Sequence, residues 1–102
     1  MIALVINPTS GNGKGQRIGK QWTDHLNSDG VSYELILKQN LDESISTLRT
    51  GLLENRFTAI VSVGGDGLAH YLFDQAISHN IPIMVVPAGT GNDFARNCRT
   101  FG

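Results

Sequence analysis

The sequence predicts an α/β fold in which a mostly parallel sheet carries helices on both faces, giving three layers. Short apolar runs alternate along the chain with longer segments whose apolar residues recur at helical spacing. Glycine clusters follow three of the apolar runs, as in loops that join strands to helices. A chain of 102 residues, 40% hydrophobic and 17% charged, can form one domain with a buried core.

Four segments have the length and composition of strands: residues 2–6, 31–38, 59–63 and 81–86. The first stops at Asn7-Pro8 and the third at Gly64, and these residue types end strands. The second alternates polar with apolar residues. The fourth confines Pro82 to its first positions, where a strand tolerates proline.

Three segments between these strands have helical period: residues 16–28, 40–52 and 68–78, the last through an apolar stripe of Leu68, Leu72 and Ala76 with Phe73 and Ile77. Asn40, with Glu43 three residues later, has the spacing of a capping pair, and Gly51 weakens the last turn of the second helix. The predicted order is therefore β-α-β-α-β-α-β, and a further helix is expected to open after the fourth strand.

Three glycine clusters come after strands: Gly11, Gly13 and Gly15; Gly64, Gly65 and Gly67; and Gly89 and Gly91. In such sheets ligands bind beyond the carboxyl ends of the strands. Glycine lets backbone N–H groups approach an anion, and a following helix N-terminus adds partial positive charge. We therefore expect the clusters to converge on one rim of the sheet and to bind phosphate.

The first loop, residues 7–15, combines its glycines with Lys14 ahead of the first helix. It lacks the Gly-Lys-Ser/Thr ending of a P-loop, so a Walker mechanism is unsupported. A plain flexible turn explains the glycines equally well, and the role of Lys14 is open between phosphate binding and none.

Asp66 stands inside the second glycine turn, where a carboxylate is a poor choice for binding bare phosphate. It suits a site in which Mg²⁺ lies between carboxylate and phosphate, or in which Asp66 orients an attacking hydroxyl. The alternative is that Asp66 is the N-cap of the helix over residues 68–78.

The third loop, residues 87–96, places Thr90 and Asp93 at the spacing of a capping box. Capping leaves Asn92 and Arg96 unexplained. An amide can read a base or ribose, and a guanidinium can neutralise phosphate, so both suit a nucleotide site.

With these loops, residues 7–15, 64–67 and 87–96, the chain resembles the N-terminal nucleotide-binding part of the diacylglycerol kinase catalytic-domain family, the bacterial-type soluble lipid kinases. Gly-Gly-Asp-Gly also occurs in NAD kinases, whose α/β domain is similar, whereas Gly-Thr-Gly-Asn-Asp-Phe-Ala-Arg points to lipid kinases. The resemblance implies ATP with Mg²⁺ and phosphoryl transfer to a hydroxyl of diacylglycerol or a related lipid. Asp66 is the candidate catalytic and metal-binding residue. The candidate nucleotide-binding residues are Asn7, Ser10, Gly11, Gly13, Lys14, Gly64, Gly65, Gly67, Gly89, Thr90, Asn92, Asp93 and Arg96.

The chain departs from the family in two ways. Leu68 stands where the family has threonine, and Tyr71 stands where it has glutamate. A leucine has no hydroxyl to contact a phosphate, so we expect weaker nucleotide binding or turnover. Family members also continue into a β-rich C-terminal domain that helps bind the lipid. Residues 1–102 are therefore expected to be a partial nucleotide-binding domain, inactive by itself.

Composition excludes several classes of function. A net charge of −1 without a run of like charge argues against binding nucleic acid, and a single cysteine, Cys98, excludes an internal disulfide. No apolar run reaches the length of a membrane span, so we expect a cytoplasmic protein that contacts the membrane surface through the missing domain. An NAD kinase-like enzyme, an inactive nucleotide-binding or interaction module, and a homo-oligomer are left open.

Overall fold

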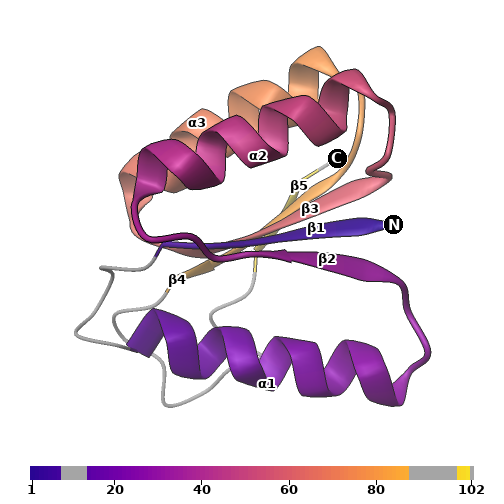
Figure 1. Ribbon diagram of the computed structural model, residues 1–102, viewed down its shortest axis with the longest axis vertical. Helices are drawn as coiled ribbons and strands as arrows, with labels where there is room; N and C mark the ends of the chain where they lie inside the picture. The colour runs from indigo at the N-terminus through magenta and orange to yellow at the C-terminus, as the bar shows by residue number, and fades with distance from the viewer. Residues whose placement is uncertain (8–13, 88–98, 102) are drawn as a thin grey trace.

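The computed structural model describes residues 1–7, 14–87 and 99–101, and strands and helices alternate in it in the predicted order (Figure 1). The elements are β1 (Ile2–Ile6), α1 (Lys14–Ser28), β2 (Tyr33–Ile36), α2 (Leu41–Leu53), β3 (Ala59–Gly64), α3 (Asp66–Ser78), β4 (Ile83–Pro87) and β5 (Arg99–Phe101). The predicted α/β class is confirmed.

The sheet has the strand order β2-β1-β3-β4-β5. Strands β1 to β4 are parallel, and β5 runs antiparallel to β4. Helix α1 covers one face of the sheet, and α2 and α3 cover the other, so the three predicted layers are present (Figure 1). The sequence did not predict β5, because a three-residue strand is too short to show a period. The helix expected after the fourth strand falls outside the described residues.

Some element boundaries differ from the predictions. Helices α1 and α3 each begin two residues early, at Lys14 and Asp66, because an apolar stripe marks where a helix packs and not where its backbone starts. Strand β2 is shorter than predicted at both ends, and β4 begins after Pro82. The carbonyl of Pro82 still accepts a hydrogen bond from Ile60 N at 3.0 Å.

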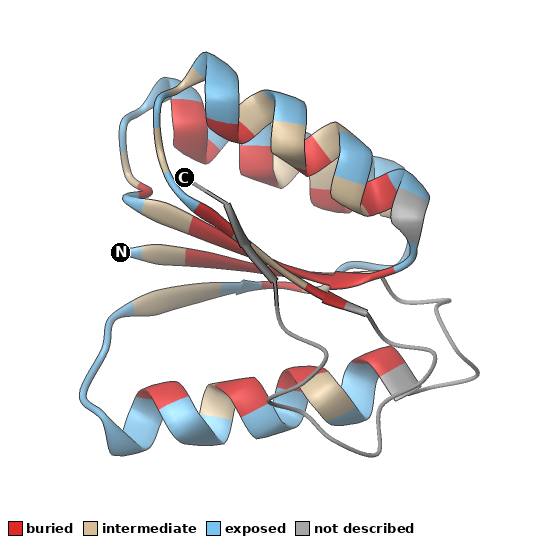
Figure 2. Ribbon diagram, turned by 180° about the vertical axis from the view of Figure 1, so that it is seen from behind, coloured by how far each residue is buried: buried red, intermediate tan, exposed pale blue. Residues whose placement is uncertain are grey.

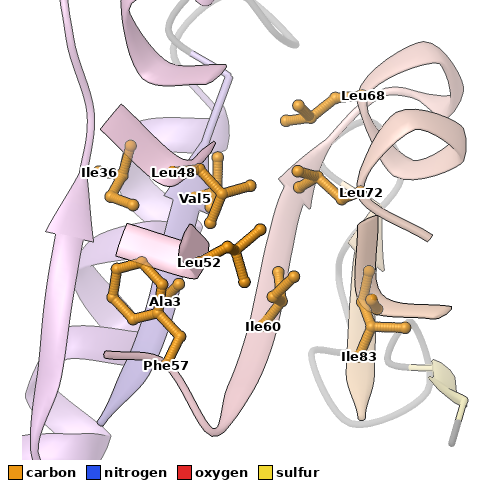
Figure 3. Close-up of a cluster of buried hydrophobic side chains, with 11 residues drawn as sticks. Ala3, Val5, Ile36, Leu48, Leu52, Phe57, Ile60, Leu68, Leu72 and Ile83 are labelled. Atoms are coloured by element: carbon orange, nitrogen blue, oxygen red, sulfur yellow. The ribbon is translucent and has the colours of Figure 1, made fainter. Parts of the chain in front are cut away.

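Two apolar clusters lie between the sheet and its helices. The buried positions of the helices accordingly face the sheet (Figure 2). The cluster beneath α2 and α3 consists of Ala3, Val5, Ile36, Leu48, Leu52, Phe57, Ile60, Leu68, Leu72, Ala76 and Ile83 (Figure 3). The cluster above α1 consists of Leu4, Ile6, Trp22, Leu26, Val61, Val63 and Val86. Strands β1 and β3 contribute to both, which explains why their sequences are nearly continuous apolar runs.

Candidate functional site

The candidate site lies at the carboxyl ends of β1 and β3, where the strand order reverses. Strand β1 leads through α1 to β2 on one side, and β3 leads through α3 to β4 on the other. The N-termini of α1 and α3 therefore lie at the same rim, on opposite faces of the sheet (Figure 1). Doubly wound sheets bind their ligands at this kind of crevice.

Asn7 and Gly64 bring the ends of β1 and β3 together. The N–H of Asn7 donates to the carbonyl of Val63 at 2.9 Å. Gly64 is buried with a φ of +154°, and a Cβ placed on it would lie 2.8 Å from Asn7 Cβ and 3.4 Å from Leu68 Cδ2. Any L-residue here would be both strained and crowded, so the close approach of the two strand ends requires glycine.

Gly65, and not Asp66, is the N-cap of α3, and Asp66 is the first residue of the helix. The alternative in which Asp66 caps the helix is therefore wrong, because the helix begins earlier than its apolar stripe. Gly65 has no side chain with which to cap α3. Its carbonyl accepts the hydrogen bond of Ala69 N at 3.2 Å. The N–H groups of this first turn lack intrahelical partners by geometry, an arrangement that favours anions.

The backbone around the start of α3 is open to a ligand. Gly65 and Gly67 are both exposed, and a Cβ placed on either would meet no described atom within 4 Å. A phosphate could therefore approach the main chain here without displacing any side chain that the structure describes.

Leu68 belongs to the core beneath the rim. Its side chain is only 3% exposed and joins the cluster with Leu72 and Ala76, which confirms this predicted stripe of α3 (Figure 3). Tyr71 is half-buried against the same cluster. Ile77, predicted to extend the apolar face, is instead 64% exposed.

Helix α1 brings its positive end to the rim. It begins at Lys14, which therefore lies in the first helical turn and not in the loop, and this turn carries no acidic residue. Gly19 lies directly against Ile6, and a Cβ on Gly19 would overlap Ile6 Cδ1. The sequence analysis missed this contact. The spacing of Gly15 and Gly19, four residues apart on one helix face, could have indicated it.

The structure thus brings together Asn7 and Gly64, at the carboxyl ends of β1 and β3, with Gly65 and Gly67 at the start of α3. Lys14 and Asp66 are placed here by their backbone positions alone. The other candidate residues lie outside the described residues: Ser10, Gly11, Gly13, Gly89, Thr90, Asn92, Asp93 and Arg96.

In the part of the chain that the structure describes, no three His, Cys, Asp or Glu residues are grouped to hold a metal ion. Across the same described residues, no helix has both the length and the apolar character needed to span a membrane.

A parallel sheet with an open, glycine-capped helix at its switch point places the chain in the class of α/β domains suited to phosphate-bearing ligands. The family described as diacylglycerol kinase catalytic domain matches residues 1–101. The chain therefore belongs to the diacylglycerol kinase catalytic-domain family, as the three loops predicted.

Its relatives carry the names of lipid kinases. The chain is 31% identical over 102 residues to sphingoid long chain base kinase 4 of Schizosaccharomyces pombe, covering 92% of this chain and 22% of that protein. It is 27% identical over 95 residues to a diacylglycerol kinase of Mycobacterium tuberculosis, covering 93% and 30%. For sphingosine kinase B of Dictyostelium discoideum the identity is 27% over 105 residues, covering 94% and 13%. The chain spans less than a third of each of these relatives.

Proposed function

We propose that the chain is the nucleotide-binding part of an ATP-dependent lipid kinase that transfers the γ-phosphate of ATP to a hydroxyl of a lipid. The main support is the convergence of Asn7, Gly64 and the glycine-capped start of α3 at the switch point, in a member of the diacylglycerol kinase catalytic-domain family. The names of the relatives include kinases of diacylglycerol and of sphingoid bases, so the acceptor is a lipid alcohol of one of these kinds.

In this proposal the phosphates of ATP lie at the start of α3. The N–H groups of the first turn and the bare backbone of Gly65 and Gly67 stabilise their negative charge. Lys14 adds positive charge from the start of α1 on the other face of the sheet. The third loop, residues 87–96, fixes the rest of the nucleotide through Thr90, Asn92, Asp93 and Arg96.

Asp66 is the residue that would hold Mg²⁺, directly or through water, because it offers a hard oxygen ligand beside the phosphate-binding backbone. When bound there, Mg²⁺ neutralises charge on the β- and γ-phosphates. The lipid hydroxyl oxygen forms a bond to the γ-phosphorus, the bond to the β–γ bridging oxygen breaks, and ADP leaves. We expect the protein to be a longer, cytoplasmic one. Its part beyond Gly102 should supply the base that takes the hydroxyl proton, and the same part should contact the membrane surface.

A calorimetric titration with ATP, with and without Mg²⁺, tests the nucleotide site. We expect saturable, Mg²⁺-dependent binding that Asp66→Ala abolishes and that Asp74→Ala, an exposed acidic residue of the same helix, leaves intact. A folded chain that binds no ATP would contradict the proposal. A chain that binds NAD and transfers phosphate to it would instead be an NAD kinase-like enzyme.

In a protein that carries the remainder of the domain, Asp66→Asn should lower phosphoryl transfer to diacylglycerol or sphingosine by at least about a hundredfold. The unfolding midpoint should stay near that of the parent protein. Full activity in this variant would remove Asp66 from the proposed role.

A further inference from the structure

We draw no further inference here: the strongest candidate, the hollow along α2 that is lined by Asp42, Ile45, Ser46, Arg49, Thr50 and Leu53, carries nothing, because nothing among the described residues shows what covers it.

Discussion

Gly64 is the residue on which the geometry of the candidate site depends most directly. It follows Val63, whose carbonyl binds Asn7 N–H, and it faces Asn7 so closely that there is no room for a side chain. Its φ of +154° is also one that L-residues rarely adopt. The two constraints have separate causes, crowding and backbone strain, and both act at the junction of β1 and β3.

We predict that Gly64→Ala lowers the free energy of unfolding by about 1–3 kcal/mol, since the new Cβ must displace Asn7 and the backbone must leave its native φ. Urea denaturation measures this. Gly67→Ala is the matched control: its Cβ would meet no described atom within 4 Å, so the stability of this variant should be unchanged or higher by up to about 1 kcal/mol. Equal losses in both variants would show that crowding at Gly64 is not the cause.

Leu68 shows what the sequence predicted at the residue scale and what it did not. The helical spacing of Leu68, Leu72 and Ala76 predicted an apolar stripe, and all three are buried. The resemblance to the family drew attention to Leu68 as a missing hydroxyl. The structure adds that the Leu68 side chain lies in the core next to Gly64. Leu68 therefore packs beneath the candidate site and supports it.

At the scale of elements, glycines let helices lie close to their neighbours. Gly19 of α1 lies against Ile6 of β1, and Gly51 of α2 lies against the ring of Phe57. The sequence suggested Gly51 only as a weakness in the last turn, yet α2 continues to Leu53 with Gly51 buried. A single sequence does not show which glycines weaken a helix and which allow it to pack, because the difference is made by a distant side chain.

We predict that Gly19→Ala destabilises the chain, although alanine is the better helix former, because its Cβ overlaps the buried Ile6 side chain. Ile6→Val removes the overlapping Cδ1. In that background, Gly19→Ala should therefore lower the free energy of unfolding by at least about 1 kcal/mol less than it does in the parent chain. A double-mutant cycle of urea unfolding measures the coupling. If the effects of Gly19→Ala and Ile6→Val on the free energy of unfolding are additive, the new Cβ does not contact Ile6. Helix α1 would then have shifted on the sheet to make room for it.

The cap at the N-terminus of α2 was predicted correctly from the local sequence. Asn40 was expected to cap it, and Asn40 Oδ1 accepts a hydrogen bond from Glu43 N at 2.9 Å. Only residues three apart in the sequence take part, so no tertiary information was needed. The start of α3 contrasts with it, because Gly65 caps that helix without a side chain and the polar residue beside it is not the cap.

For the whole molecule, the candidate site is built from segments distant in sequence on a sheet with a core on each face. A ligand that binds this rim only in the folded state must stabilise the entire domain. The size of that stabilisation depends on the ligand concentration relative to the dissociation constant.

We therefore predict that Mg²⁺ with ATP at a hundred times its dissociation constant raises the free energy of unfolding by about 2.7 kcal/mol. Thermal and urea unfolding should both show the shift. Asp66→Ala should lose it and Asp74→Ala should keep it, while Mg²⁺ without nucleotide serves as the ligand control. A shift of equal size in both variants would count against the proposed site.

The sequence by itself determined the order of the first seven elements, the α/β class and the stripe of α3. These features depend on local periods and turn residues, which short segments carry on their own. The tertiary structure decided that Gly65 caps α3 and that Gly64 has no room for a side chain beside Asn7. It also decided that Gly19 of α1 packs against Ile6 and that Leu35 is exposed at the edge of the sheet. Each depends on which strands become neighbours, and the order β2-β1-β3-β4-β5 follows from packing the whole chain.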